Sequence, residues 1–490
     1  MASVPSPDRL PNSAPERIAS TAGAPAAGPD DCVSALLADA SRRLAQQFEQ
    51  LAPVTPPRAE DLEAMGAVLD ETASRLGDNY PYFHPFYAGQ MLKPPHPLAR
   101  AAYSLAMAIN PNNHARDGGR ASSEMEIEAV GHIAQMFGWH APGFLGHLTS
   151  SGTIANLEAL WVAGQTQPGK RIVGSAQAHY THSRISAVLK LDYASVEADS
   201  RGRMDLNALE SELKKGDVGT VVVTLGTTAT GGVDPLDQIL GLRDRYGFRI
   251  HVDAAYGGYF RLILDALDEP ARRAFDSIDQ ADSIVVDPHK HGLQPYGCGC
   301  VLFRDPGVGR FYKHDSPYTY FTSKDLHLGE ISLECSRAGA SAVALWATQR
   351  LLPNVPHGAF AQGLAAGRRA ALELDRRLRG DGRFAALAAG PPELDIVVWA
   401  IRDKSLTASR AGSPDQPISY AQRIFEACAR RNLHLALVQL PQHWFPADGH
   451  RGDSSLVTCL RSVLMKPEHE GWVPQIWQEY MGAAGEILGE

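Results

Sequence analysis

Between Gly146 and Phe303 the chain alternates short apolar runs, rich in β-branched residues, with segments of helical spacing. This alternation predicts an α/β fold in which a mostly parallel central sheet is flanked by crossover helices. The runs expected to form strands cover residues 172–175, 220–225, 249–252, 283–286 and 300–303. Ligands of such sheets bind beyond the carboxyl ends of the strands, so the polar residues that follow each run are candidates for a functional site.

Lys290 follows one of these runs, in the segment Asp287-Pro-His-Lys-His-Gly292. The run 283–286 should stop at the Asp-Pro pair, which is a turn signal. A lysine between two imidazoles at the mouth of a buried strand is an unusual place for a solvated charge. We therefore predict that Lys290 forms a Schiff base with a carbonyl cofactor. From this segment alone, a surface lysine after a strand is an equal alternative.

A second strand-end segment, Thr149-Ser-Ser-Gly-Thr-Ile-Ala-Asn156, opens a helix with several hydroxyl residues around one glycine. Such residues cap the free N–H groups at a helix start, and they leave those groups available to a bound anion. A plain capping motif accounts for one Ser or Thr, whereas this segment has four. The pattern favours a phosphate site at Ser151, Gly152 and Thr153.

Further polar residues follow the other runs, at His179, Thr228 and Asp253. A carboxylate that ends a buried strand is costly to desolvate unless it has a cationic partner. Together with the phosphate site and Lys290, these residues are the parts that hold pyridoxal 5′-phosphate: an anion site, an acid for the pyridine nitrogen and an amine for the aldehyde. No GxGxxG sequence follows a strand, which argues against a nucleotide-dependent oxidoreductase.

Composition limits the kinds of molecule that this chain is expected to bind. A formal net charge of −9 over 490 residues argues against nucleic acid as a main partner. No apolar run is long enough to span a membrane, and the first residues lack the layout of a signal peptide. The six cysteines are scattered without a CxxC pair, so neither a disulfide framework nor a metal site is expected, and we predict a reducing cytoplasmic location.

Four regions are expected along the chain. An Ala-, Pro- and Ser-rich tail should be disordered, and a helical segment should follow it. The alternating pattern defines a large cofactor-binding domain, and the helix-rich remainder, with strands such as 396–401 and 456–460, should form a small α+β domain. The predicted regions are residues 1–30 (tail), 31–110 (N-terminal helical segment), 111–350 (large domain) and 351–490 (small C-terminal domain).

These motifs together resemble the group II pyridoxal-phosphate-dependent amino-acid decarboxylases, which include glutamate, aromatic-L-amino-acid and tyrosine decarboxylases. The resemblance covers about residues 80–350 and is carried by His84-Pro-Phe86, 149–156, Ala178-His-Tyr180, Thr224-Leu-Gly-Thr-Thr228, His251-Val-Asp-Ala-Ala-Tyr256, Asp287-Pro-His-Lys290 and Ser336-Arg337. It implies the fold-type I architecture of pyridoxal-phosphate-dependent transferases and a homodimer with active sites at the subunit interface. It also implies decarboxylation of an L-amino acid through an external aldimine and a quinonoid intermediate.

The resemblance implies roles residue by residue. Lys290 carries the cofactor, His179 stacks on its ring, and Asp253 pairs with the ring nitrogen. The remaining cofactor contacts expected from the motifs are Ser151, Gly152, Thr153, Thr228, Ala255 and His289. The family also uses a mobile-loop tyrosine to protonate the substrate's Cα, and here Tyr318 is favoured slightly over Tyr320.

The substrate itself stays open at this stage. The aromatic segment Asn79–Gly89 is loop-like, and it is either a core corner or a wall of the substrate pocket. The candidate pocket residues are Phe83, His84, Phe86 and Arg337. The residues after Lys290 differ from those of animal aromatic decarboxylases, so a carbon–carbon lyase similar to sphingosine-phosphate lyase, or an aminotransferase, remains an alternative on the same cofactor.

Overall fold

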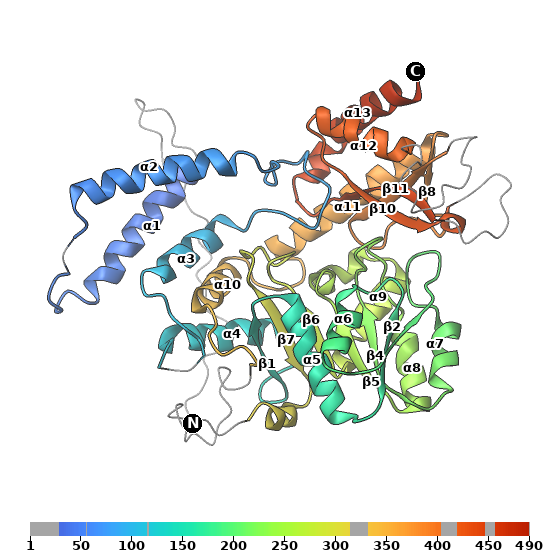
Figure 1. Cartoon of the computed structure of the whole chain (residues 1–490), viewed down its shortest axis with the longest axis horizontal. Coiled ribbons are helices and arrows are strands. Elements are labelled where there is room, and N and C mark those ends of the chain that lie inside the picture. The colour runs from blue at the N-terminus through green and yellow to red at the C-terminus, as the bar shows by residue number, and fades with distance from the viewer. Residues whose placement is uncertain are drawn as a thin grey trace.

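A seven-stranded sheet forms the centre of the fold (Figure 1). In this computed structural model the described residues are 29–54, 56–114, 117–313, 332–402, 419–445 and 456–489. The strand order is β1-β7-β6-β5-β4-β2-β3. The strands are β1 (Leu145–Thr149), β2 (Arg171–Ser175), β3 (Tyr193–Val196), β4 (Val218–Thr224), β5 (Arg249–Asp253), β6 (Ser283–Val286) and β7 (Gly299–Phe303).

The sheet is mostly parallel, which confirms the predicted fold class. Strands β2 to β6 pair in parallel, and β7 alone runs antiparallel to its neighbours β1 and β6. A parallel return requires a crossover, usually a helix. The segment between β6 and β7 contains no helix among its described residues, and it is the segment that carries Lys290. The chain therefore turns back beside β6 directly after the lysine.

Helices cover the sheet on both faces and bury its strands. All seven residues of β4 are buried, and Val221, Val222 and Val223 are fully inaccessible. The helix α5 packs across several strands from its start beside β1. The helices and 3-10 turns of this region are α3 (Pro97–Met107), α4 (Arg120–Met136), α5 (Gly152–Thr166), α6 (Thr181–Val188), α7 (Leu206–Leu213), α8 (Leu236–Tyr246), η1 (Gly258–Ala266), α9 (Glu269–Asp276), η2 (Ile278–Gln280), η3 (Pro306–Phe311) and α10 (Gly339–Leu351).

The C-terminal part forms a second layered unit, at the upper right of Figure 1. Its antiparallel sheet has the order β10-β11-β9-β8 and packs with three helices around a core of its own. The elements are α11 (Ala359–Gly380), β8 (Phe384–Ala386), β9 (Ile396–Ile401), α12 (Tyr420–Arg430), β10 (Ala436–Pro441), η5 (Gln442–Trp444), β11 (Leu456–Val463) and α13 (His469–Leu488). The expected strands 396–401 and 456–460 lie in β9 and β11. The domain boundaries drawn from the sequence stay a prediction.

Two N-terminal helices, α1 (Pro29–Gln46) and α2 (Ala59–Leu76), extend from the rest of the chain (Figure 1). They are separated where the prolines of residues 53–57 predict a break. Helix α1 packs on α3, whereas α2 buries none of its residues. Across the described segments, no helix is long and apolar enough to cross a membrane. The predicted disordered tail falls on residues 1–28, which lie outside the described residues, and on the start of α1.

Candidate active site

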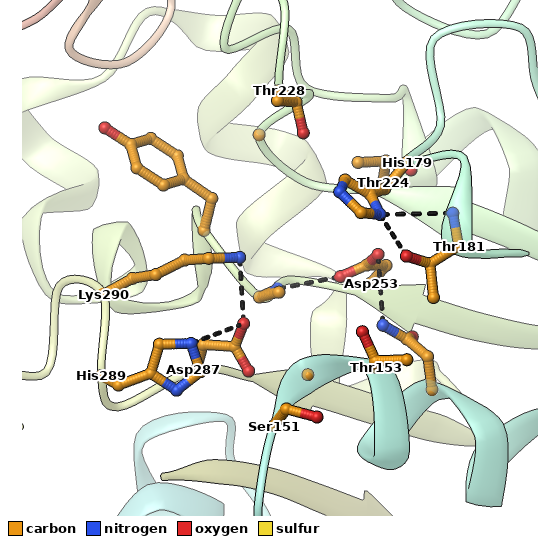
Figure 2. Close-up of a pocket in the computed structure, with 15 residues that line it drawn as sticks. Ser151, Thr153, His179, Thr181, Thr224, Thr228, Asp253, Asp287, His289 and Lys290 are labelled. Carbon is orange, nitrogen blue, oxygen red and sulfur yellow. Dashed lines mark hydrogen bonds and ion pairs between the residues drawn. The ribbon is translucent and has the colours of Figure 1, made fainter. Parts of the chain in front are cut away.

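The polar residues that follow β1, β2, β4, β5 and β6 surround one cavity of about 200 Å³. Figure 2 shows their side chains converging on this space from separate strand ends. Its lining consists of Ser151, Gly152, Thr153, Asn156, His179, Thr181, Thr224, Gly226, Thr228, Asp253, Ala255, Tyr256, Asp287, His289 and Lys290. All nine residues expected from the sequence to hold a cofactor are among them.

Lys290 enters the cavity from the turn after β6 and forms an ion pair with Asp287 (Figure 2). Its Nζ lies 2.9 Å from Oδ2 of Asp287, and its side chain is 23 % exposed. Burial alone would lower the pKa of Lys290, but the charges of Asp287 and Asp253 outweigh burial and raise it. The ammonium form is therefore favoured, and an incoming aldehyde must meet a lysine that first loses a proton.

Asp253 ends β5 at the floor of the cavity, and its partner is a buried histidine. His182 Nε2 lies 2.7 Å from Oδ2 of Asp253, while the Ala255 N–H donates to Oδ1 at 3.0 Å. Burial alone would raise the pKa of Asp253, but the hydrogen bond from His182 and the charges of His182 and Lys290 hold it below its ordinary value. The side chain therefore stays a carboxylate inside the protein.

His182 is a functional candidate that the sequence reading missed. The sequence did indicate that such a residue was needed, because a carboxylate that ends a buried strand requires a cationic partner. His182 lies in α6, three residues after His179, and its side chain is fully buried. What the sequence could not supply was the direction of that side chain, which depends on how α6 packs beside α5.

The N-terminus of α5 faces the cavity with the predicted hydroxyl residues. Ser151 is the N-cap, and its Oγ accepts the Ile154 N–H at 3.3 Å. A Cβ on Gly152 would lie 2.5 Å from Oδ2 of Asp287, so only glycine allows this close approach. Free N–H groups at a helix start suit an anion such as phosphate. Two carboxylates near this end oppose a second negative charge: Asp287 lies beside Gly152, and Glu334 accepts the Ser150 N–H at 2.8 Å.

His179 and Thr228 lie on the far side of the cavity from Asp287 in Figure 2. The Nδ1 atom of His179 is 2.5 Å from Oγ1 of Thr181, and it also accepts the Thr181 N–H at 3.3 Å. These contacts fix the ring plane. Burial lowers the pKa of His179, and the charge of Lys290 adds to this effect, although Asp253 opposes it. The neutral imidazole of His179 can therefore stack on a planar ligand in the cavity.

His289 precedes the lysine and is anchored by backbone. Its Nδ1 lies 2.6 Å from the carbonyl oxygen of Cys298, and its Nε2 is 3.5 Å from Asp287 Oδ2. Burial lowers the pKa of His289, against the opposing charge of Asp287. Cys298 and Cys300 are buried in one core cluster. In the segments that the structure describes, no group of three potential metal ligands is assembled.

The aromatic residues expected to line a substrate pocket lie elsewhere in this chain. The rings of His84 and Phe86 pack edge-on against Trp472 of α13, with centroids 4.9 and 5.3 Å away. Phe83 is 73 % exposed and borders a separate pocket beside Lys93. The backbone explains this placement, because the N–H of Ala88 donates to His434 of the C-terminal unit. Within one chain, the structure does not bring these residues to Lys290.

Arg337 is not among the residues that line the cavity of its own chain. Its guanidinium is buried and forms an ion pair with Glu126 of α4. It also donates to the carbonyl oxygens of Leu148 and Asn113 at 3.0 and 2.8 Å. A buried guanidinium needs such partners, and these contacts tie the segment before α10 to β1. Tyr318 and Tyr320, the candidate proton donors, lie outside the described residues.

Comparison with known proteins places these features in a family. A family model described as the pyridoxal-dependent decarboxylase conserved domain matches residues 79–401. An L-tyrosine decarboxylase of Enterococcus faecium is 29 % identical, with 61 % of this chain matched to 65 % of that protein. A probable L-tyrosine/L-aspartate decarboxylase of Methanospirillum hungatei is 30 % identical and matches over 64 % of this chain and 82 % of its own length.

The fold comparison agrees over nearly the whole chain. A solved structure of Oryza sativa TDC with PLP and tryptamine superposes with a TM-score of 0.71, covering 95 % of this chain and 100 % of that chain. The sequence identity is 19 %. At this identity the likeness establishes the architecture alone. The matched segment spans just under two thirds of the Enterococcus faecium protein.

Proposed function

The chain belongs to the family of pyridoxal-dependent decarboxylases, and from this premise we propose that it holds pyridoxal 5′-phosphate on Lys290 and decarboxylates an L-amino acid. The products are CO2 and the corresponding amine. The observation that carries the proposal is the convergence of Lys290, Asp253 and the N-terminus of α5 on one cavity. An amine, an acid and an anion site are the three groups that this cofactor requires of its protein.

The donor set fits the cofactor on structural grounds. Ser151, Gly152 and Thr153, which form the start of α5, line the cavity where an anion could meet the helix N-terminus. The Oγ1 atom of Thr224, which lines the cavity, is buried without a hydrogen-bond partner among the described residues, so it is free to meet a ligand. When bound, pyridoxal phosphate supplies an electron-withdrawing ring that accepts the electron pair left by the departing carboxylate.

The protein's own residues then have distinct tasks. Lys290 provides the amine that attaches the aldehyde, and Asp253 holds a proton at the ring nitrogen. Ser151, Gly152, Thr153 and His289 would bind the phosphate, His179 and Ala255 would hold the ring, and Thr228 would bind its hydroxyl. Because Asp253 has a lowered pKa, it stays charged over the whole neutral range and can stabilise a protonated ring.

Decarboxylation is favoured over the lyase and aminotransferase alternatives by family membership. The activities for which the relatives are named make L-tyrosine the first substrate to test and L-aspartate the second. We further propose that Tyr318 returns the proton to Cα and that Arg337 acts through the protein frame rather than by touching substrate.

We also propose that the protein works as a homodimer. The apolar residues of α2 have no cover in the single chain: Leu62, Met65, Val68 and Leu69 are all more than half exposed. Phe83, remote from Lys290 of its own chain, is available to a second copy. A second subunit would bury the helix face and complete the substrate pocket. A cytoplasmic location is proposed with it, in keeping with six free cysteines.

The proposal is tested by product analysis. The purified holoprotein is incubated with a panel of L-amino acids that includes tyrosine and aspartate, and CO2, aldehyde and keto acid are measured in parallel. We expect stoichiometric CO2 and amine for at least one substrate, and loss of both in Lys290→Ala. Release of an aldehyde or a keto acid without CO2 would replace the decarboxylase by the lyase or the aminotransferase.

A further inference from the structure

The carboxylate expected to face the cofactor ring has a second, hidden partner. His182 Nε2 lies 2.7 Å from Oδ2 of Asp253, and the two side chains are 0 and 6 % exposed. The other ring nitrogen of His182, Nδ1, has no hydrogen-bond partner among the described residues. The Nε2 proton is therefore directed at Asp253, and His182 acts on the cavity only through that carboxylate.

A ring nitrogen and a buried carboxylate that share one proton have two arrangements. The proton resides on the nitrogen, giving a pyridinium–carboxylate pair, or on the carboxyl oxygen, giving a neutral pair. In a site of low polarity the neutral pair is favoured, because charge separation there is costly. A hydrogen-bond donor on the outer side of the carboxylate stabilises its charged form and shifts the balance to the pyridinium.

We propose that His182 is a positioning residue that keeps the shared proton on the cofactor's ring nitrogen by stabilising the Asp253 carboxylate. The inference rests on the proposed function, because it needs the cofactor in the cavity. No atom is gained or lost in this step, since the same proton moves between the ring nitrogen and a carboxyl oxygen of Asp253. A protonated ring is the stronger electron acceptor, so this placement determines how well the site can take up charge.

The surroundings of the pair support a role for His182 in particular. Asn156 approaches the same Oδ2 at 3.5 Å, a long contact, and its Oδ1 is bonded to His251 at 2.8 Å. Burial lowers the pKa of His251 to about 3, so that ring is neutral. Lys290 and His179 face the inner side of Asp253. His182 is thus the short donor on the outer side of the carboxylate.

The chain offers a matched control pair. His147 Nε2 lies 2.7 Å from Oε2 of Glu158, and both side chains are fully buried. The distance is the same as that between His182 and Asp253, and both pairs are buried, but neither His147 nor Glu158 lines the cavity. His147→Gln therefore shows the effect of losing a buried histidine–carboxylate bond elsewhere in the protein. A change at the cofactor ring is expected only from substitutions of His182.

The test is nitrogen NMR of holoprotein loaded with pyridoxal phosphate labelled with ¹⁵N in the ring. The wild-type signal gives the protonated reference, and Asp253→Ala gives the unprotonated one. We expect His182→Phe, which keeps a ring but removes the donor, to move the signal most of the way to the Asp253→Ala position. His182→Gln restores an N–H donor and should return the signal toward wild type, and His147→Gln should leave it unchanged.

An unchanged ring-nitrogen signal in His182→Phe, with cofactor bound, overturns the inference and leaves the proposed function intact. His182→Leu removes the same donor and replaces His182→Phe if that variant does not fold. Equal displacement by His182→Gln and His182→Phe also overturns it, because the effect would then come from packing. If wild type binds no cofactor at Lys290, the proposed function itself fails, and absorbance of the loaded protein reveals this before any NMR.

Discussion

At the residue scale, Asp287 affects both the attachment of the cofactor to Lys290 and the binding of its phosphate. The Asp287 carboxylate raises the pKa of the lysine, and it also lies where a Cβ on Gly152 would stand. Its Oδ1 is buried without a hydrogen-bond partner in the described part of the chain. A negative charge at this position opposes both a free lysine amine and a phosphate at the start of α5.

Asp287→Asn is expected to bind pyridoxal phosphate about tenfold more tightly, which corresponds to about 1.4 kcal/mol. The substitution keeps the shape but removes the charge that repels phosphate and holds Lys290 protonated. Titration of the cofactor-free protein, followed by the absorbance of the bound cofactor, measures the affinity at constant pH. Asp276→Asn removes an exposed carboxylate elsewhere and serves as the control. Weaker binding by Asp287→Asn than by the control would contradict the account.

The residues at the strand ends were predictable from the sequence, whereas the buried residues that contact them, such as His182, were not. The positions of Ser151, His179, Asp253 and Lys290 follow from where strands stop, and a parallel sheet brings such ends together. His182 required knowledge of which way α6 turns its side chains. Phe83 and its neighbours were expected at the substrate because their sequence is aromatic and loop-like. Within one chain, backbone contacts with the C-terminal unit hold His84 and Phe86 against α13.

At the scale of elements, one carboxylate links the two sheets behind the cavity. Asp395, directly before β9, accepts the Tyr256 hydroxyl at 2.6 Å, and its Oδ2 is 3.3 Å from Nε2 of His291. Tyr256 lines the cavity and His291 follows Lys290, so the small sheet contacts both cofactor-binding turns. Burial raises the pKa of Asp395 to about 6, although the Tyr256 hydrogen bond opposes this rise.

Tyr256→Phe is expected to lower stability by about 1–3 kcal/mol at pH 8, because it leaves a buried carboxylate without its donor. The pKa of Asp395 is about 6 in the folded protein, against an ordinary value of 3.8. The folded protein therefore loses stability as the pH rises from 3.8 to about 6, and the loss is complete above pH 6. Loss of the donor should therefore cost less at pH 5, where the carboxyl is largely protonated. Thermal unfolding at the two pH values measures the difference.

Tyr259→Phe is the matched control for this prediction. Tyr259 is also buried, but its hydroxyl has no hydrogen-bond partner among the residues described. Its removal should change the unfolding temperature little at either pH. Equal losses in the two variants, or a larger loss at pH 5 than at pH 8 in Tyr256→Phe, would show that Asp395 does not depend on the Tyr256 hydroxyl.

The order of strands and helices along the chain was more predictable than whether each strand runs parallel or antiparallel to its neighbours. Five expected runs correspond to β2, β4, β5, β6 and β7, because each is a short apolar run that ends at a turn signal. Strands β1 and β3 were not among the expected runs. In β3, two of the four residues are only partly buried and one is exposed, so its sequence lacks an apolar run. The antiparallel direction of β7 depends on the absence of a helix between Lys290 and Gly299 in the described chain, and composition does not reveal this.

At the scale of the whole molecule, the N-terminal helices argue for a second copy. An apolar helix face with no cover is costly in water and is typical of an interface. Leu62, Met65 and Leu69 recur at helical spacing on α2, and each is more than half exposed. The sequence predicted a helical segment in this region. In the structure, α2 contains no buried residue.

Leu69→Asp is therefore expected to weaken the dimer at least tenfold, since it places a charge in the apolar face. Sedimentation equilibrium over a range of protein concentrations measures the dissociation constant. Ala67→Asp, two positions away on the exposed opposite side of the same helix, adds the same charge and should have little effect. A monomeric wild type, or equal weakening by both substitutions, would remove α2 from the interface.

The attachment of the cofactor to Lys290 is the central proposal for the function of this protein. Two other lysines are the natural competitors, because burial lowers the pKa of Lys466 to about 7 and that of Lys93 to about 8. Both border a different pocket and have more free amine at neutral pH than Lys290. The geometry of the strand-end cavity and the family match both favour Lys290 over them.

Borohydride reduction of the holoprotein, followed by peptide mass mapping, tests this claim most directly. Reduction fixes the cofactor to whichever amine holds it, as a stable secondary amine. The account predicts a single modified peptide that carries the added mass on Lys290, and no modification in Lys290→Ala. Label on Lys466 or Lys93 with Lys290 unmodified would contradict it.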